Sequence, residues 1–259
     1  MLQFPQTGTS SAKIKLCEFC GEPRETAQTG GFVYHRQCQC AGAREARDAR
    51  AQDLAQREAE KQAQRCEYLL QRAGLDGGRA RRQTFESFVT DTTPRRKARA
   101  WAERYVESFG DDSNWPVLYG PPGTGKTHLS RAIARAVVTQ YGVTALVVNF
   151  LEWYQGLKAD LRNEKQILGR VCAVGFLVVD DLDRQNLTEY SQVKLYEIIN
   201  QRYERAAPVV ITTNRQDLEQ FLQSGRDVNQ LTGAVMYDRI YEMAEWVKFS
   251  GASYRRRAR

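Results

Sequence analysis

The sequence predicts a three-layer α/β domain in which helices cover both faces of a parallel sheet. Apolar segments of strand length recur along the chain, at 116–119, 144–149, 175–181, 209–214 and 245–249. Stretches with the apolar spacing of helices alternate with them, at 126–141, 150–168, 188–205, 217–223 and 232–243. Such alternation is typical of a parallel sheet buried on both sides. A glycine-rich loop between the first strand and the first helix is the third observation, and it also indicates a ligand.

The glycine-rich loop predicts a site for a nucleotide. Residues 120–127 fit the pattern G-x-x-x-x-G-K-[ST] at every defined position. The glycines let backbone N–H groups point at phosphate oxygens, and the helix N-terminus adds positive potential. We expect Lys126 to reach the β- and γ-phosphates of ATP, and the Thr127 hydroxyl to ligate Mg²⁺. The expected nucleotide-binding residues are Gly120, Pro121, Pro122, Gly123, Thr124, Gly125, Lys126, Thr127 and His128.

Polar residues at two strand ends complete a predicted ATPase site. Ligands of open parallel sheets bind at the carboxyl ends of the strands. Asp180 would hold Mg²⁺, directly or through water, and Asp181 would orient or deprotonate the attacking water. A glutamate at this second position is common, so Asp181 offers a shorter arm. Asn214 would position the same water or the γ-phosphate, and a strand-end cap is the alternative. The predicted catalytic residues in this loop and at these strand ends are Lys126, Asp180, Asp181 and Asn214.

Four cysteines near the N-terminus predict a zinc site. Cys17 and Cys20 form a C-x-x-C pair, and Cys38 and Cys40 form a C-x-C pair. Thiolates at such spacing suit a structural, tetrahedral Zn²⁺. His35 could replace Cys40 as the fourth ligand. Free thiols or a redox pair are the plainer alternatives, but so small a segment needs a metal to fold.

The charge pattern and composition predict three regions. Residues 1–42 would form the zinc module, 43–79 a helical arm with a glycine-rich hinge at 74–78, and 80–259 the ATPase domain. A helix is expected over 94–109 and a turn over 111–114 before the phosphate loop. No apolar run is long enough to span a membrane, and no signal pattern opens the chain, so we expect a cytoplasmic protein without a membrane partner.

Basic residues outnumber acidic ones, 38 to 31, and the excess is concentrated at 72–99 and in the last five residues. Clustered positive charge favours a nucleic-acid partner. For 72–99 alone, a solvated surface explains the charge equally well.

Several segments together resemble the AAA+ ATPases of the bacterial and phage helicase-loader family, the DnaC/DnaI type. They are the phosphate loop, the strands ending LVVDDL and VITTN, the lead-in T-F-x-x-F at 84–88, the segment M-Y-D-R-I at 236–240 and S-Y-R at 253–255. The resemblance covers residues 80–256. IstB-type transposition ATPases are similar in the same core, but a zinc-type N-terminus is not their usual pattern. Only ten residues follow Phe249, too few for a full C-terminal lid, and both families share that truncation.

The resemblance implies roles for residues that spacing alone does not assign. Arg239 matches an arginine finger that reaches the γ-phosphate of a neighbouring subunit, although a surface salt bridge with Asp238 or Glu242 is the alternative. Arg255 matches a nucleotide-sensing position near the C-terminus. The helix 150–168 lies where the resembled loaders face DNA. Its expected DNA-binding residues are Tyr154, Lys158, Arg162 and Lys165. An ordinary amphipathic helix with a basic outer face is the alternative.

The expected function is therefore ATP-dependent loading of a hexameric replicative helicase onto single-stranded DNA in replication initiation. The cofactors would be ATP, Mg²⁺ and Zn²⁺, and the ATPase domains would associate with one another. Two alternatives are an IstB-type transposition helper, which would bind duplex DNA, and a nucleotide-switched adaptor with negligible hydrolysis.

Overall fold

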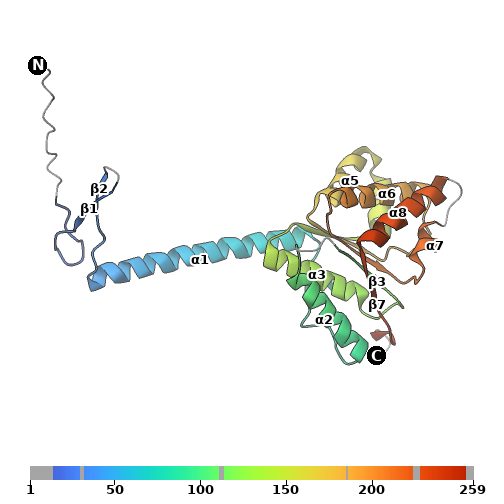
Figure 1. Cartoon of the computed structure of the whole chain (residues 1–259), viewed down its shortest axis with the longest axis horizontal. Coiled ribbons are helices and arrows are strands. Elements are labelled where there is room, and N and C mark those ends of the chain that lie inside the picture. The colour runs from blue at the N-terminus through green and yellow to red at the C-terminus, as the bar shows by residue number, and fades with distance from the viewer. Residues whose placement is uncertain (1–13, 30–31, 111–113, 185, 224–227, 255–259) are drawn as a thin grey trace, which may run out of the picture. The chain divides into compact units, whose positions relative to one another are not determined.

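The computed structural model describes residues 14–29, 32–110, 114–184, 186–223 and 228–254, and the chain forms two compact units, 1–63 and 64–259 (Figure 1). Each unit is described by itself. No helix among the described residues is both long enough and apolar enough to cross a lipid bilayer.

The first unit contains a small antiparallel hairpin and the beginning of a long helix. Strands β1 (Thr26–Thr29) and β2 (Phe32–His35) pair with Thr26 opposite His35. The helix α1 (Ala41–Arg72) starts in this unit and ends in the second one. The hairpin buries little, since Phe32 is 80% exposed. An apolar core therefore does not explain how this unit holds its shape.

The second unit is built on a five-stranded sheet in the order β4-β5-β6-β3-β7, in which every neighbouring pair is parallel. The strands are β3 (Trp115–Tyr119), β4 (Ala145–Asn149), β5 (Phe176–Asp180), β6 (Val209–Thr213) and β7 (Ala244–Lys248). The sequence prediction of a parallel sheet is confirmed, and each predicted strand is present with its ends shifted by one residue or less. Asp181 and Asn214 each lie one residue beyond the end of their strand, β5 and β6 respectively.

Helices cover both faces of this sheet, as Figure 1 shows. The helices α2 (Thr93–Glu107) and α3 (Lys126–Tyr141) pack on one face together with the end of α1. The other face is covered by α5 (Glu164–Ala173), α6 (Glu189–Glu204), α7 (Leu218–Leu222) and α8 (Val228–Met243). Strand β5 shows the alternation directly, because Val178 enters the first layer while Leu177 and Val179 enter the second. The fold is thus three-layered.

The C-terminal end of α1 belongs to the core of the second unit. Leu69, Ala73 and Leu75 are buried there, and the Val147 amide on edge strand β4 donates to the Ala73 carbonyl at 3.1 Å. Gly74 has a φ of +74°, which glycine adopts without a steric penalty, and the helix ends there. The arm of mixed charge therefore becomes a packed element over its last turns.

The predicted single helix over 150–168 is wrong. The segment forms α4 (Phe150–Ala159), a 3-10 turn η2 (Leu161–Asn163) and α5. Asp160 interrupts the helix with a φ of −133° and accepts a hydrogen bond from the Asn163 side-chain amide at 2.8 Å. Leu161, which an unbroken helix would place inward with Leu157 and Leu168, is 59% exposed.

One further expectation about a helix face needs correction. The helical spacing over 188–205 predicts an apolar face of Val193, Tyr196, Ile199 and Tyr203 on α6, but Val193 is 38% exposed, whereas Leu195 and Ile198 are buried. Arg202 on the same helix is also buried, and its guanidinium donates to the carbonyls of Val174 and Pro208. Residues 111–113 of the predicted turn lie outside the described part of the chain.

Candidate active site

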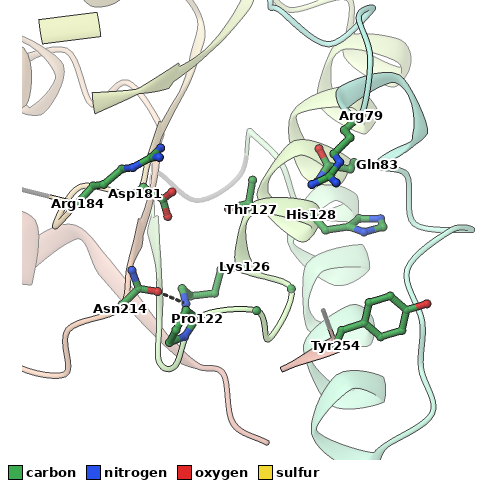
Figure 2. A pocket seen from close by; sticks show the side chains of 12 residues that line it. Arg79, Gln83, Pro122, Lys126, Thr127, His128, Asp181, Arg184, Asn214 and Tyr254 are labelled. Carbon is green, nitrogen blue, oxygen red and sulfur yellow. Dashed lines mark hydrogen bonds between the residues drawn. The ribbon is translucent and has the colours of Figure 1, made fainter. Parts of the chain in front are cut away.

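The phosphate loop joins β3 to α3 and lines a cleft of about 890 Å³ (Figure 2). Gly125, with a φ of +110°, immediately precedes the helix, and α3 runs without interruption from Lys126. The helix N-terminus therefore faces the cleft with its free N–H groups and its positive dipole end. Such an arrangement attracts phosphate.

Lys126 is nearly buried, and its amino group has three oxygen partners. Its Nζ donates to the carbonyls of Gly120 at 2.6 Å and Pro121 at 2.9 Å, and to Asn214 Oδ1 at 2.9 Å. These bonds hold the ammonium group over the loop, where a phosphate oxygen could replace one acceptor. Figure 2 shows the Asn214 amide directed at the lysine from the end of β6.

Asn214 is itself fixed by the segment that follows β5. Its backbone amide donates to Asp183 Oδ1 at 2.9 Å. The residue thus joins two neighbouring strand ends to the lysine, which a simple strand-end cap would not do.

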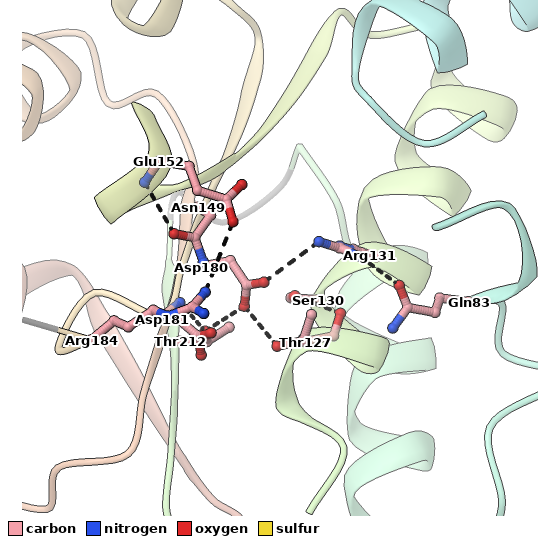
Figure 3. A network of polar contacts seen from close by, with 10 residues as sticks. All are labelled: Gln83, Thr127, Ser130, Arg131, Asn149, Glu152, Asp180, Asp181, Arg184 and Thr212. Carbon is pink, nitrogen blue, oxygen red and sulfur yellow. Dashed lines mark hydrogen bonds and ion pairs between the residues drawn. The ribbon is translucent and has the colours of Figure 1, made fainter. Parts of the chain in front are cut away.

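A hydroxyl and a carboxylate on adjacent elements form the candidate magnesium site. Thr127 Oγ1 donates to Asp180 Oδ1 at 2.9 Å, and Asp180 is only 2% exposed (Figure 3). Hydroxyl and carboxylate oxygens are the ligands that Mg²⁺ prefers, beside phosphate oxygens and water. The donor set fits the ion: Thr127 and Asp180 would hold it, and its positive charge would offset the negative charge of the phosphates.

Thr212 connects the two acidic residues, and sequence reasoning missed it. Its hydroxyl donates to Asp180 Oδ1 at 2.7 Å and accepts from the Asp181 amide at 2.9 Å. The residue is fully buried on β6. The available signal was its place in T-T-N, two residues before Asn214, where a hydroxyl reaches the end of the neighbouring strand.

Asp181 lies in the cleft with an unusual backbone. Its φ is +52°, in the left-handed region, where aspartate and asparagine are tolerated better than most residues. Burial, followed by the charge of Asp180, raises the pKa of the Asp181 carboxyl. A raised pKa makes a carboxylate a better proton acceptor near neutral pH.

His128 also lines the cleft, but its ring is turned toward the lead-in segment. Its Nε2 lies 2.9 Å from the Thr84 carbonyl and 3.2 Å from Ser87 Oγ, and burial lowers its pKa. Because the ring is engaged by this segment, His128 links the loop to residues 84–88. Phe88 packs edge-on against the same ring.

The last described residues cover the phosphate loop. The Tyr254 amide donates to the Gly123 carbonyl at 2.9 Å, and a Cβ on Gly123 would collide with the Ser253 side chain. Arg95, buried on α2, lies over the Tyr254 ring at 5.3 Å and donates to the Ala252 carbonyl. Arg255 lies outside the described residues, so its predicted role has no structural counterpart here.

Further residues line the cleft that the sequence did not single out. They are Arg79 and Gln83, which precede the lead-in, Arg184 from the segment after β5, and Tyr254. Arg79 and Arg184 add positive charge around the phosphate loop, which suits a polyanionic ligand. Basic character in 72–99 was noted in the sequence, but nothing there pointed to one residue.

Arg239 is absent from the lining of this cleft. On α8 it donates to the Asn200 side chain of α6 and lies over the rings of Tyr196 and Tyr203, at 5.5 and 5.4 Å. The salt bridge with Asp238 or Glu242 that we considered does not form among the described residues; instead Glu242 accepts a hydrogen bond from Tyr203.

The predicted DNA-binding face is only partly exposed. Lys158, Arg162 and Lys165 are exposed. Tyr154 is 6% exposed, and its hydroxyl lies 2.9 Å from Thr188 Oγ1, so its expected stacking on a base is wrong. Leu157, three residues later and therefore on the same face of α4, is also buried. This face is the inner side of the helix.

The four cysteines of the first unit gather at one point. Their Sγ atoms all lie within 4.8 Å of one another, with Cys17 and Cys40 at 3.7 Å and Cys20 and Cys38 at 3.5 Å. A tetrahedron with Zn–S bonds of about 2.3 Å has edges of about 3.8 Å. The chemistry and the spacing therefore fit zinc, and His35 is not part of this group. Hydrogen bonds from the Cys20 and Phe19 amides lower the pKa of Cys17 to about 6, whereas the neighbouring Cys38 thiol raises the pKa of Cys20 to about 12 and burial raises that of Cys40. Of these three thiols, Cys17 therefore gives the thiolate that a metal needs most readily.

Comparison with known proteins identifies the family. The DnaC replicative helicase loader of Escherichia coli K12 is 27% identical over 179 residues, 67% of this chain and 69% of that protein. A putative insertion sequence ATP-binding protein of Sinorhizobium fredii is 31% identical over 204 residues, 77% of this chain and 65% of that protein. The crystal structure of the DnaC helicase loader superposes with a TM-score of 0.56 at 22% identity, over 65% of this chain and 97% of that one. The sequence model of the family described as IstB-like ATP binding protein matches residues 39–259, and the chain therefore belongs to this ATP-binding family.

Proposed function

We propose that the protein is an ATPase that loads a hexameric replicative helicase onto single-stranded DNA. The observation that carries the proposal is the assembled cleft. In it, Lys126 and Thr127 of the phosphate loop contact Asn214 and Asp180, which lie at the ends of two neighbouring strands. The similarity to DnaC loaders, together with a cysteine cluster of zinc type outside the ATPase core, favours loading over the other activities of the family.

The ATP step follows from the positions of these side chains. Lys126 would exchange loop carbonyls for β- and γ-phosphate oxygens, and Thr127 with Asp180 would hold Mg²⁺. Asp181 would accept a proton from the attacking water, and Asn214 would orient that water or the γ-phosphate. The short Asp181 side chain predicts slow hydrolysis, in keeping with a loader that acts once per loading event.

Arg239 would act in a neighbouring subunit. Within one chain its guanidinium is held by Asn200 and two tyrosine rings, outside the cleft. A guanidinium offered from a neighbour stabilises charge on a transferring phosphoryl group. Association of ATPase domains would therefore bring Arg239 to the phosphates of the next subunit. Arg239→Ala should abolish ATP-driven assembly and leave nucleotide binding by a single subunit unchanged.

DNA would contact the broken helix around η2. Lys158, Arg162 and Lys165 supply the positive charge there, and Tyr154 does not take part. The zinc module, 1–42, and the arm, 43–79, would grip the helicase, and the ATPase domain, 80–259, would assemble with its copies and hold DNA.

The test is helicase loading on a closed circular single strand. A tagged full chain purified from its host with ATP should carry a hexameric helicase, identified by mass spectrometry, and should place that helicase on the circle. Lys126→Ala is the matched control, because it retains the zinc module but removes the phosphate contact. Absence of helicase transfer by a wild-type protein that binds ATP would refute the loader assignment.

A transposition helper is the second candidate, and the similarity to the insertion sequence protein of Sinorhizobium fredii favours it. It would co-purify with a transposase and prefer duplex DNA. Anisotropy titrations with labelled single- and double-stranded oligonucleotides, each with ATP, separate the two. A nucleotide-switched adaptor would instead bind ATP without measurable turnover, with or without DNA.

A further inference from the structure

The environment of Asp180 contains a cation that the ATPase mechanism does not use. One carboxylate oxygen, Oδ1, accepts from the hydroxyls of Thr127 and Thr212. The other, Oδ2, faces the guanidinium of Arg131, with 3.7 Å between Oδ2 and the nearest nitrogen (Figure 3). Arg131 thus forms an ion pair with Asp180. A buried carboxylate without a compensating charge is costly, so this pairing matters when no metal is bound.

Arg131 is held in this position from two sides. It lies one helical turn after Thr127 on α3, so both side chains face the end of β5. Its other terminal nitrogen donates to Gln83 Oε1 at 2.8 Å, and Gln83 lines the cleft. The Arg131 side chain is 25% exposed. A guanidinium bound to both a carboxylate and a cleft-lining amide has little freedom to leave.

We propose that Arg131 is an internal counter-cation, which neutralises Asp180 when Mg²⁺ is absent and so lets the cleft bind nucleotide without metal. The inference rests on the proposed function, because it requires a nucleotide beside Lys126. Without Arg131, the Asp180 carboxylate would repel the phosphates until Mg²⁺ arrived. When Arg131 and Mg²⁺ are both present, the repulsion between their positive charges reduces the increase in nucleotide affinity that Mg²⁺ produces.

The measurable quantity is the magnesium gain, defined as the Kd for mant-ADP in magnesium-free buffer divided by the Kd in saturating Mg²⁺. Magnesium is removed with a resin rather than a chelator, so that the cysteine cluster keeps its metal. Arg131→Met removes the charge and keeps an apolar stem, and should raise the gain by about tenfold or more, chiefly by weakening binding without magnesium. Arg131→Gln is a second neutral variant with the same expected result, in case the first does not fold.

Arg131→Lys separates charge from hydrogen bonding. It keeps the positive charge but not the two-sided contact, so its magnesium gain should stay close to that of the wild type. Arg170→Met is the matched control, because Arg170 is exposed on α5 away from the cleft. It should leave both Kd values unchanged.

The outcomes are distinguishable. If the folded neutral variants lose affinity equally in both buffers, the magnesium gain is unchanged. Arg131 then has only a structural role, and the inference is overturned. Nucleotide binding by the wild type would still support the proposed function. If the wild type binds mant-ADP in neither buffer, the nucleotide site itself is refuted, and the inference falls with it.

Discussion

Replacing Thr212 by valine should destabilise the second unit far more than the same change one residue later. Valine has nearly the shape of threonine, so the substitution removes a hydroxyl and leaves the packing almost intact. At Thr212 the hydroxyl donates to the buried Asp180 carboxylate at 2.7 Å and accepts from the Asp181 amide at 2.9 Å. At Thr213, equally buried, it accepts one amide hydrogen bond from Arg215 at 3.1 Å.

The magnitude follows from these contacts. A hydrogen bond to a charged group contributes about 1.5–3 kcal/mol and a neutral one about 0.5–1.5 kcal/mol. Thr212→Val should therefore lower the free energy of unfolding by about 2–4.5 kcal/mol, and Thr213→Val by about 0.5–1.5 kcal/mol. Because Asp180 is 2% exposed, water cannot replace the lost donor.

Urea denaturation followed by tryptophan fluorescence measures both variants. Trp115 is fully buried on β3 and Trp246 lies on neighbouring β7, so the signal reports on the sheet that carries Thr212. The experiment is done in magnesium-free buffer, since Mg²⁺ would stabilise Asp180 independently. Equal or smaller destabilisation by Thr212→Val than by Thr213→Val would show that the hydroxyl does not support the acidic pair, and would refute the reasoning.

Three other predictions concern the ligands. Lys126→Ala should weaken ATP binding by about ten- to a hundredfold, since it removes a charged donor to the phosphates; calorimetry measures the affinity, and equal ATP affinity of wild type and Lys126→Ala would contradict the site. Asp181→Asn should bind ATP normally and hydrolyse it slowly, which phosphate release measures. Protein prepared without chelator should contain about one Zn²⁺ per chain, and Cys17→Ser should lose it while the second unit stays folded. A native mass spectrum that shows no bound metal on the wild-type protein would exclude the zinc site. Lys158→Glu combined with Arg162→Glu should strongly weaken binding of a labelled single-stranded oligonucleotide, and the affinity of the wild type should fall steeply with added salt. An unchanged affinity of the double variant, measured by fluorescence anisotropy, would show that these residues do not contact DNA.

The sheet and the order of its elements could be predicted because strands β3 to β6 are largely apolar runs and stretches with helical apolar spacing separate the strands. Strand β5 illustrates this, since all five of its residues are buried and no other element suits such a run. The break at Asp160 could not be seen in the same way. Leu157, Leu161 and Leu168 keep helical spacing through it, so the apolar pattern gives no sign that α4 ends at Ala159.

At the candidate site, the residues of the loop and strand ends were predictable because their order in the chain fixes their place at one sheet edge. Thr212 and Arg131 were not, since their roles depend on which neighbour each faces across the strands or the helix. Tyr154 was predicted to be exposed, and this failed for the same reason. The helical repeat places it beside Lys158, but its burial depends on the contact with Thr188, which lies in another segment of the chain.

The left-handed backbone at Asp181 determines which substitutions can be interpreted at that position. Asparagine adopts a φ of +52° about as readily as aspartate, so Asp181→Asn changes the chemistry and leaves the main chain in place. Alanine would remove the carboxylate and also favour a different backbone angle, and glutamate would lengthen the arm under the same strain. A loss of turnover in the alanine or glutamate variant would therefore confound geometry with catalysis, and the asparagine variant is the one from which the role of the carboxylate can be inferred.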